Sequence, residues 1–261
     1  MDLNLTGKNA LVCGSTQGIG RSCAMELALL GASVTVMARN EGALKQVVSE
    51  LPATSGQQHD YLLADFSEPD TVRDKIAGLV SRKMVHVLVN NTGGPPPGPA
   101  IDANVNEFVQ AFSNHLLCNH ILVQAVSPAM ISSGYGRIIN IISTSVKMPI
   151  RGLGVSNTIR GAVANWSKTL SMELGKYRIT VNNVLPGSTM TGRLEAIIAK
   201  NAEKSGKTAH EVQEEMIKEI PAGRIADPRE VAAAVAFLAT PAASYINGIN
   251  LPVDGGRTGS L

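Results

Sequence analysis

The sequence contains few cysteines. Its 261 residues include three, Cys13, Cys23 and Cys118, which lie far apart. Their odd number argues against a framework of disulfide bonds, and the lack of a Cys-x-x-Cys spacing argues against a zinc site, so we expect no bound metal. Free thiols of this kind are typical of a reducing compartment, and we therefore expect the protein in the cytoplasm.

Long apolar segments are also lacking. The longest uninterrupted apolar run covers residues 231–239, about half of what an α-helix needs to cross a bilayer. Near the N-terminus, Asp2 is followed only by the short apolar run 10–13, whereas a secretory signal has a basic stretch and a long apolar segment. We therefore expect neither a membrane span nor export.

Neither sign of charge dominates. The chain has 23 Lys and Arg residues against 21 Asp and Glu residues, and no run of basic residues concentrates the net charge of +2. Electrostatic attraction therefore gives no reason to expect nucleic acid as a partner. With 44% hydrophobic residues, a chain of this length can bury the core of one domain, and its expected partner is a small molecule.

Short apolar runs alternate with helical patterns along the whole chain, which is typical of βαβ units and a parallel sheet. A segment resembling a capping box with an early proline, Ser67 to Asp70, predicts that a helix starts there. No flexible linker divides the chain, so we predict one doubly wound α/β domain over residues 1–261. The seven expected strands are 10–13, 33–38, 58–64, 85–90, 137–143, 180–185 and 250–253.

Two stretches interrupt this regular alternation. Residues 93–99 contain four prolines, and residues from about 192 to 220 are polar with a strong tendency to form helices. We expect them to form the rim and the lid of a binding cleft.

A glycine-rich segment follows the first expected strand and opens a helical pattern. Glycines let the backbone approach a pyrophosphate closely, and free N–H groups at a helix start attract its charge. The Gly-Lys-Ser/Thr ending of nucleoside triphosphate loops is absent. We therefore interpret the segment as a dinucleotide site, with a plain tight turn as the alternative. Its residues are Gly14, Ser15, Thr16, Gln17, Gly18, Ile19 and Gly20.

The G-x-x-x-G-x-G spacing of this segment resembles that of the short-chain dehydrogenase/reductase family. The resemblance covers residues 5–256 and is closest to the 3-oxoacyl-acyl-carrier-protein reductases. It implies a Rossmann-type domain, oxidoreductase activity on a carbonyl or alcohol, and a homotetramer built through the long helices. The later segments that resemble the family, in order, are Asn90 to Gly93, strand 138–143 with its final serine, Pro186-Gly187 with Thr191, and Asp254-Gly255-Gly256.

The resemblance also implies which residues contact a nicotinamide cofactor. Gln17 and Ile19 of the glycine-rich segment would contact the phosphates. Two of the other residues have alternative interpretations, because Asp65 could merely cap a turn and Thr191 could cap the lid helix. The remaining implied contacts are Asp65 and Phe66 at the adenine, Asn91 at the adenosine ribose with Gly93 beside it, and Pro186, Gly187 and Thr191 at the nicotinamide.

The end of the second expected strand distinguishes NAD from NADP. In this fold an acidic residue there binds the ribose diol, whereas a cation accommodates a 2′-phosphate. Arg39 follows the strand here, and no carboxylate occupies Met37, Ala38 or Asn40. A guanidinium forms paired hydrogen bonds with phosphate oxygens and stays charged, so we expect NADP(H). The alternative for Arg39 is a solvated side chain in a loop.

Most of the family's catalytic residues are absent. Family members use a serine, a Tyr-x-x-x-Lys pair and an asparagine on the preceding helix. By the family's spacing Ser143 is the serine, but the tyrosine and lysine positions fall on Ser156 and Arg160. A serine hydroxyl is a poor acid and an arginine keeps its proton, so this pair cannot simply replace Tyr and Lys. Arg160 could still hold the nicotinamide ribose while Ser143 donates a hydrogen bond to the substrate.

The asparagine position falls on His115, which we expect on one helical stripe with Phe108, Phe112 and Asn119. A histidine pKa of about 6.5 suits proton transfer, so His115 is a candidate proton donor; a histidine hydrogen-bonded within the core is an equal alternative. Two functions are therefore open. One is an NADP(H)-dependent oxidoreductase with an atypical site, and the other is a protein that binds NADP(H) without turnover, as a sensor or a non-catalytic subunit.

Overall fold

The computed structural model describes residues 1–260, and its centre is one sheet of seven parallel strands in the order β3-β2-β1-β4-β5-β6-β7. This confirms the predicted doubly wound α/β fold. The apolar residues of the five inner strands are buried on both faces, as expected for a parallel sheet covered by helices, whereas the two edge strands are partly exposed. The strands are β1 (Asn9–Cys13), β2 (Ser33–Ala38), β3 (Asp60–Leu63), β4 (Val87–Asn90), β5 (Gly136–Ile141), β6 (Ile179–Pro186) and β7 (Asn250–Val253).

Three of the predicted strands were too long. Strands β3, β4 and β5 contain fewer residues than the apolar runs 58–64, 85–90 and 137–143 from which they were predicted. The runs extend further because loop residues next to the strands are buried too, such as Val85 and Ile142. One consequence matters for the site, since Ser143 lies in the loop beyond β5 rather than in the strand.

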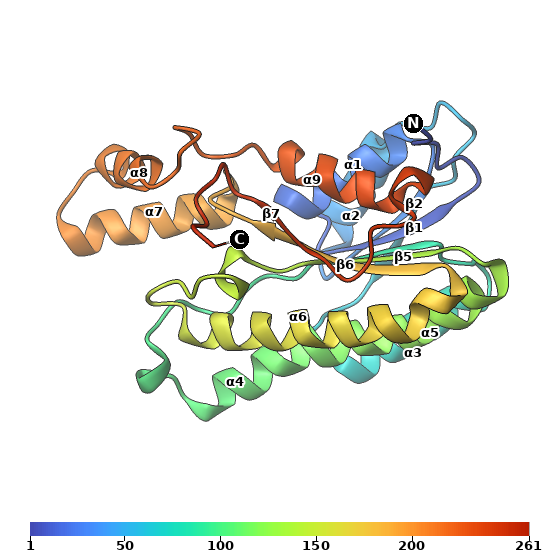
Figure 1. The fold of residues 1–261 in the computed structure, drawn as a ribbon, viewed down its shortest axis with the longest axis horizontal. Helices are drawn as coiled ribbons and strands as arrows, with labels where there is room; N and C mark the ends of the chain where they lie inside the picture. The colour runs from blue at the N-terminus through green and yellow to red at the C-terminus, as the bar shows by residue number, and fades with distance from the viewer. Residues whose placement is uncertain (261) are drawn as a thin grey trace.

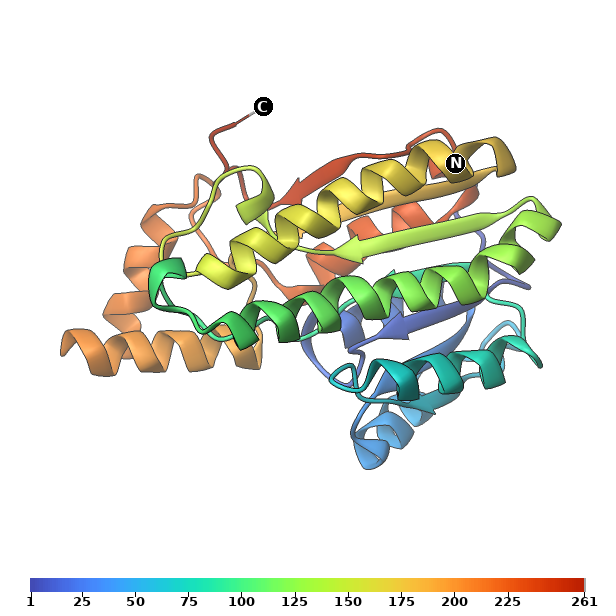
Figure 2. The same ribbon diagram turned by 90° about the horizontal axis from the view of Figure 1, so that it is seen from below.

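Helices cover both faces of the sheet (Figures 1 and 2). Successive side chains of a strand point to opposite faces of the sheet. In β1, Val12 packs in the cluster that includes α1 and α9, whereas Leu11 packs in the cluster that includes α3 and α5. One face carries α1 (Gly18–Leu29), α2 (Glu41–Glu50) and α9 (Pro228–Ala239), and the other carries α3 (Pro69–Val80), α4 (Val105–Phe112), α5 (Cys118–Ser133) and α6 (Gly154–Leu174).

Helix α3 begins at Pro69 as predicted, but the predicted capping box is wrong. The N-cap residue is Glu68, and no side chain accepts a hydrogen bond from the first turn of the helix. Asp65 forms the turn instead, because its carboxylate accepts a hydrogen bond of 2.9 Å from the Ser67 backbone N–H.

Helices α4 and α5 form one long helix interrupted by a single π-helical segment, Ser113–Leu117. The stretch Val105–Ser133 is long and apolar enough to cross a membrane by length and composition alone. It packs against α3, α6, β4 and β5, as a core helix does. This stretch contains no long uninterrupted apolar run, because polar residues such as Asn114, His115 and Asn119 interrupt it.

The polar stretch predicted as a lid forms two helices, α7 (Gly192–Ser205) and α8 (Ala209–Lys218). They extend beyond the carboxyl edge of the sheet and lie beside each other (Figure 1). Thr191 caps α7, and a capping box of Thr208 and Glu211 starts α8. Local caps therefore define both helices, while the rest of the domain provides them with little support.

A row of asparagine side chains crosses the sheet near its carboxyl edge. Asn90, Asn140, Asn183 and Asn250 are opposite one another in β4, β5, β6 and β7. Each amide N–H donates to the next amide oxygen, at 2.8, 3.0 and 2.8 Å. A buried polar group is costly unless it is paired, so this row specifies the register of four strands.

We expect Asn140→Ala to lower the free energy of unfolding by about 3 kcal/mol, because it leaves three buried polar partners unpaired. Those partners are the side chains of Asn90, Ser167 and Asn183. Urea denaturation measures the loss. Asn165→Ala on the exposed side of α6 is the control and should change the value by less than about 0.5 kcal/mol. Similar losses in both variants would show that the row contributes nothing beyond an ordinary substitution.

Candidate active site

The strand order places the expected crevice for a ligand where β1 and β4 are neighbours in the sheet. The chain leaves these two strands in opposite directions, which makes this the topological switch point at which such folds bind ligands. Asn91 connects the two loops, because its Nδ2 donates to the carbonyl oxygens of Cys13 at 3.3 Å and Gly14 at 3.1 Å. The predicted role of Asn91 at the adenosine ribose therefore stays a prediction, beside an observed role in holding the glycine-rich loop.

The glycine-rich loop is too closely packed for side chains at two of its glycines. A Cβ atom on Gly20 would lie 2.1 Å from the Gly14 carbonyl oxygen, and one on Gly14 would lie 2.5 Å from the Asn91 carbonyl oxygen. Helix α1 begins at Gly18, with Gln17 as an N-cap whose side chain makes no capping hydrogen bond. The N–H groups at this helix start are thus open to an anion, which fits a pyrophosphate.

The other loop residues divide between packing and exposure. The Ser15 hydroxyl is buried and accepts a hydrogen bond of 3.0 Å from the Met37 N–H, so it holds the loop against β2. Thr16 is half-buried, Gln17 is exposed, and Ile19 packs partly on the core. The structure therefore assigns Ser15 a packing contact and leaves Thr16 and Gln17 accessible to a ligand.

Thr191 faces the loop from the opposite side of the crevice. A Cβ on Gly18, which has a positive φ of 53°, would lie 3.1 Å from Thr191 Cγ2. The Thr191 hydroxyl also accepts a hydrogen bond of 3.3 Å from the Leu194 N–H at the start of α7. The alternative interpretation of Thr191 as a helix cap is therefore observed, and it leaves the residue beside the glycine-rich loop.

Arg39 follows β2 with an exposed guanidinium, 3.9 Å from the carboxylate of Asp65 after β3. Asp65 forms the turn described above, and hydrogen bonding to Ser67 lowers its pKa below the ordinary value. Phe66 is half-buried, and its carbonyl oxygen accepts a hydrogen bond from the Cys118 thiol. These three residues border the same side of the crevice, although nothing in their contacts is specific for adenine.

The segments Pro186-Gly187 and Asp254-Gly255-Gly256 pack against each other. The Gly187 N–H donates to the Val253 carbonyl oxygen at 3.0 Å, and a Cβ on Gly187 would lie 2.7 Å from Asp254 Cα. The Asp254 carboxylate accepts hydrogen bonds from the backbone N–H groups of Gly256 and Thr258. The two motifs are distant in sequence, and the close approach of their backbones explains the glycine at position 187.

Ser143 and Arg160 meet at the end of β5. Arg160 Nη1 donates to the Ile141 carbonyl oxygen at 3.1 Å, two residues before Ser143. The Ser143 hydroxyl accepts a hydrogen bond of 3.1 Å from the Ser145 N–H, so its own proton is free to be donated. Ser156 lies one helical turn before Arg160 in α6 and has no hydrogen-bond partner within residues 1–260. The structure thus brings three of the four predicted catalytic residues to one edge of the sheet.

The fourth, His115, lies in the π-helical segment and is buried. Its Nδ1 shares a short hydrogen bond with the Thr92 hydroxyl, in the loop after β4. Burial, with the positive charges of Arg160 and Arg193, lowers the pKa of His115 from its ordinary 6.5 to about 2. An imidazole that is neutral at pH 7 lacks the acidic proton of the imidazolium form and keeps only a weakly acidic ring N–H, so the structure favours the packing interpretation over the proton donor.

One residue of the predicted helical stripe that contains His115 lies outside it. Phe108 and Asn119 are on the inner side with His115, but Phe112 is 40% exposed. The reason is the π-helical segment, which adds a residue to the turn and breaks the regular 3.6-residue periodicity. Such segments occur often at functional sites, yet apolar periodicity gives no sign of them.

No tyrosine takes the place of the missing one among the described residues. Tyr135 and Tyr177 precede β5 and β6, at the edge of the sheet opposite Ser143. The Tyr135 hydroxyl donates to the Ala239 carbonyl oxygen, the Tyr61 hydroxyl donates to Glu41, and Tyr245 is fully exposed. Residues 1–260 also contain no cluster of three His, Cys, Asp or Glu side chains suited to a metal ion, and the three cysteines are free and buried.

The sequence analysis missed Arg193, which follows the Thr191 cap in the first turn of α7. Its Nη1 and Nη2 donate to the carbonyl oxygens of Gly94 at 2.8 Å and Pro95 at 3.1 Å. Arg193 therefore connects the predicted lid to the proline-rich rim. A cation two residues after a predicted nicotinamide contact is the signal that would have identified it.

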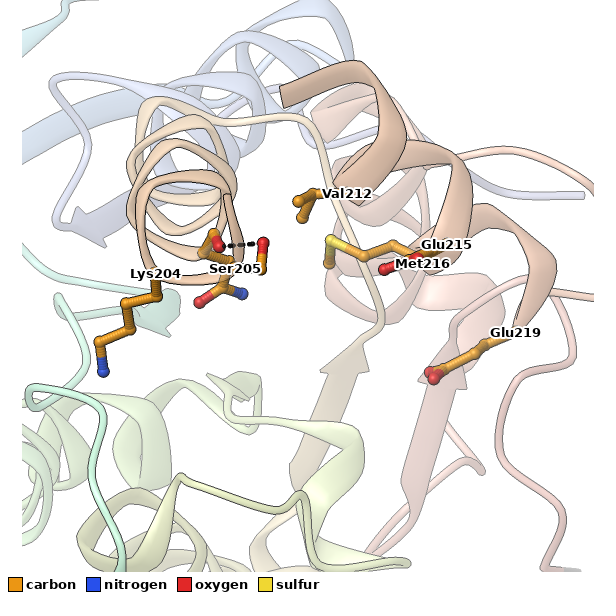
Figure 3. A pocket seen from close by; sticks show the side chains of 7 residues that line it. Lys204, Ser205, Val212, Glu215, Met216 and Glu219 are labelled. Carbon is orange, nitrogen blue, oxygen red and sulfur yellow. Dashed lines mark hydrogen bonds between the residues drawn. The ribbon is translucent and has the colours of Figure 1, made fainter. Parts of the chain in front are cut away.

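An open hollow lies between the two lid helices (Figure 3). Val212 and Met216 give it an apolar wall, and charged side chains point to its mouth. None of the predicted catalytic or cofactor residues lines it. The hollow therefore belongs to the lid, and it is distinct from the crevice at the carboxyl edge. Its lining residues are Asn201, Lys204, Ser205, Val212, Glu215, Met216 and Glu219.

The low pKa of His115 should affect stability in acid. Below pH 6.5 the unfolded chain takes up a proton at this side chain, whereas the folded protein does so only near pH 2. Stability contributed by His115 is thus present above pH 6.5 and falls as pH decreases, by about 1.4 kcal/mol per pH unit. We expect His115→Gln to reduce the slope of unfolding free energy against pH by this amount between about pH 6 and about pH 5.

The control is His210→Gln, which replaces an exposed histidine on α8. Its slope of unfolding free energy against pH should equal that of the unaltered protein. Urea denaturation at several pH values gives both slopes. If His115→Gln leaves the slope unchanged, His115 takes up a proton in the folded state, and the proton-donor role regains support.

Comparison with known proteins agrees with this geometry. A family model described as enoyl-(acyl carrier protein) reductase matches residues 14–258. Gluconate 5-dehydrogenase of Gluconobacter oxydans is 31% identical over 99% of this chain and 97% of its own. The crystal structure of L-sorbose reductase from Gluconobacter frateurii, complexed with NADPH and L-sorbose, has a TM-score of 0.94 at 27% identity, with full coverage of both chains.

A further solved structure, of a short-chain dehydrogenase/reductase family protein, is 31% identical with a TM-score of 0.83 and covers 97% of this chain and 99% of that one. The family model, this identity and the motifs at the carboxyl edge of the sheet lead to the same conclusion. The chain belongs to the short-chain dehydrogenase/reductase family.

Proposed function

We propose that this protein is an NADP(H)-dependent oxidoreductase that interconverts a small carbonyl compound and its alcohol. The observation that carries the proposal is the open start of α1, held under Asn91 and facing Thr191, with Ser143 at the adjacent edge of the sheet. The bound NADPH of the similar L-sorbose reductase supports the choice of cofactor. So does Arg39, whose exposed guanidinium is available to a 2′-phosphate.

The reduction requires a hydride at the carbonyl carbon and a proton at the oxygen. NADPH supplies the hydride when it is bound. As the hydride adds, the π electron pair of the carbonyl moves to oxygen, and the free proton of the Ser143 hydroxyl stabilises the developing charge. The Ser156 hydroxyl, which lacks a protein partner, can pass a proton from water to this oxygen without ionising.

A second function remains a candidate because of one specific observation. No side chain provides a suitable acid at neutral pH: Ser156 is a serine, Arg160 retains its proton, and His115, with a pKa of about 2, is not in its protonated form. A protein with this site could bind NADP(H) without turnover, as a sensor or a non-catalytic subunit. Assays of ketones, alcohols and 3-oxoacyl thioesters, combined with an NADPH titration, separate the two, because the second function predicts binding alone.

We also propose that the protein assembles as a homotetramer through its long helices. Helices α4, α5 and α6 lie side by side along one face of the molecule (Figure 2). Exposed apolar side chains, which a second copy of this chain would cover, are Val105, Val109, Phe112 and Leu117 along the first two helices and Met172 on α6. A cytoplasmic location, a small-molecule substrate and the absence of nucleic-acid or membrane partners complete the proposal.

The cofactor assignment is tested by Arg39→Asp. This change replaces a phosphate partner with a repelling carboxylate, so we expect NADPH binding to weaken about 100-fold and NADH binding by less than about 3-fold. Isothermal titration calorimetry measures both dissociation constants. The control, Lys75→Asp on α3, reverses a charge away from the crevice and should change neither. Equal weakening for the two cofactors would remove Arg39 from the 2′-phosphate site.

The atypical pair is tested by restoring the family residues. In the double variant Ser156→Tyr with Arg160→Lys, an ammonium lowers the pKa of a phenol, so we expect kcat/KM for carbonyl reduction with NADPH to rise at least about 10-fold. Each single change should achieve less, because the phenol and the ammonium act as a unit. An NADPH titration shows whether the double variant is folded, since position 156 is 92% buried and a tyrosine needs space there.

A different result would identify another donor of the proton that the carbonyl oxygen receives. If the unaltered protein is already a fast reductase and His115→Ala removes activity without changing NADPH affinity, His115 is the leading donor. The idea that Ser156 and Arg160 mark a disabled site would then be wrong.

A further inference from the structure

Arg160 is a buried cation with almost no partners. The residue is 8% exposed, and its one hydrogen bond within residues 1–260 is to the Ile141 carbonyl oxygen. No carboxylate in that part of the chain pairs with it. A buried charge is costly unless it is paired, so a cation in this state indicates a binding site for an anion.

Arg137 shows what a satisfied buried arginine looks like in the same fold. It also lacks a carboxylate, but it donates to the carbonyl oxygens of Gly136, Arg178 and Thr240 and lies 4.2 Å from the ring centre of Tyr135. Arg137 is at the opposite edge of the sheet from Ser143. The contrast shows that the missing partners of Arg160 are particular to the crevice.

A second arginine lies beside the first. Arg193 forms no ion pair within residues 1–260, and its two guanidinium nitrogens donate to Gly94 and Pro95, in the loop that follows β4. Arg160 is held at the end of β5, and these two strands are paired from Asn90 to Asn140. The two guanidinium groups are therefore both held at the carboxyl edge of the sheet, by segments of neighbouring strands.

The two arginines repel each other in the absence of a ligand. Burial, with the positive charge of Arg193, lowers the pKa of Arg160 to about 10. His115, bonded to Thr92 in the same loop, is held neutral beside the same two charges and so adds no third one. An anion between the arginines would remove the repulsion and satisfy the free N–H groups.

We propose that Arg160 and Arg193 bind a carboxylate of the substrate, so that the protein reduces a 2-oxo acid or oxidises the corresponding 2-hydroxy acid. The inference rests on the oxidoreductase function proposed above. The planar guanidinium matches a carboxylate through two parallel hydrogen bonds. The phosphates of NADP(H) are expected at the start of α1 and at Arg39.

The position of Ser143 limits the distance between the two groups of the substrate. Ser143 is two residues beyond the carbonyl oxygen that holds Arg160, and two residues of chain span at most about 7 Å. The backbone of Ser143 therefore lies near the point where Arg160 is held, and a 2-oxo acid, whose two groups are adjacent, is the substrate class that we propose for this arrangement. The carbonyl gains a hydride and a proton, the cofactor loses two electrons, and the carboxylate is unchanged.

The test compares 2-oxopentanoate with 2-oxopentanamide, which has nearly the same shape and no charge. With NADPH we expect kcat/KM to be at least about 10-fold higher for the acid. Arg193→Met should lower the value for the acid at least about 10-fold and change that for the amide by less than about 3-fold. Arg160→Met, at a predicted catalytic position, should lower the ratio of the acid value to the amide value at least about 10-fold. Arg73→Met, on the exposed surface of α3, is the matched control and should change neither value.

Calorimetry provides a measurement that does not depend on activity. We expect 2-oxopentanoate to bind the NADP⁺ complex of the unaltered protein and to bind both arginine variants at least about 10-fold more weakly. The NADPH dissociation constant of Arg193→Met should stay unchanged. If it rises and the acid and amide are affected alike, the arginines serve the cofactor and the inference is overturned.

The remaining outcomes separate the two proposals. Reduction of neutral ketones with no preference for the acid leaves the oxidoreductase function standing and overturns the carboxylate site. Arginine-dependent binding of 2-oxopentanoate without reduction of any substrate supports the carboxylate site and overturns the oxidoreductase function. If the protein reduces no substrate and binds neither probe, both the oxidoreductase function and the carboxylate site are overturned.

Discussion

The row of asparagine amides from β4 to β7 is the interaction on which the rest of the site depends. Its hydrogen bonds align the carboxyl ends of four strands, and each strand then enters a segment of the crevice within a few residues. Asn91 and Thr92 follow Asn90, Ser143 follows Asn140, Gly187 follows Asn183, and Asp254 follows Asn250. A slip of one residue in any of these strands would move its asparagine to the other face and its loop away from the site.

Electrostatics distinguishes this crevice from the rest of the molecule. Several exposed arginines elsewhere pair with carboxylates, as Arg21 does with Glu50 and Arg224 with Glu230. At the crevice, Arg160 and Arg193 have only carbonyl oxygens, which leaves a positive charge without a counter-ion. Burial, together with the same charge, lowers the pKa of His115 and keeps this side chain neutral. One arrangement therefore both removes the protonated form of the histidine and favours an anionic substrate.

Much of the fold could be predicted because its signals are local. The seven strands, the glycine-rich turn and the start of α3 follow from apolar runs, glycines and an early proline that act over a few residues. Strand ends were less accurate, because burial continues past the last paired residue at Val85 and Ile142. The π-helical segment at His115 could not be predicted, because it results from packing between helices and leaves no mark on the apolar pattern.

The sequence by itself determined the family, the phosphate-binding turn and the replacement of tyrosine and lysine by Ser156 and Arg160, because these depend on residue type and spacing. The tertiary structure alone decided what those residues experience. It buried Arg160 without a carboxylate, placed Arg193 beside it from a distant helix, and lowered the pKa of His115. Charge interactions and desolvation depend on distance through space, and the distances between β4, β5 and α7 exist only in the folded chain.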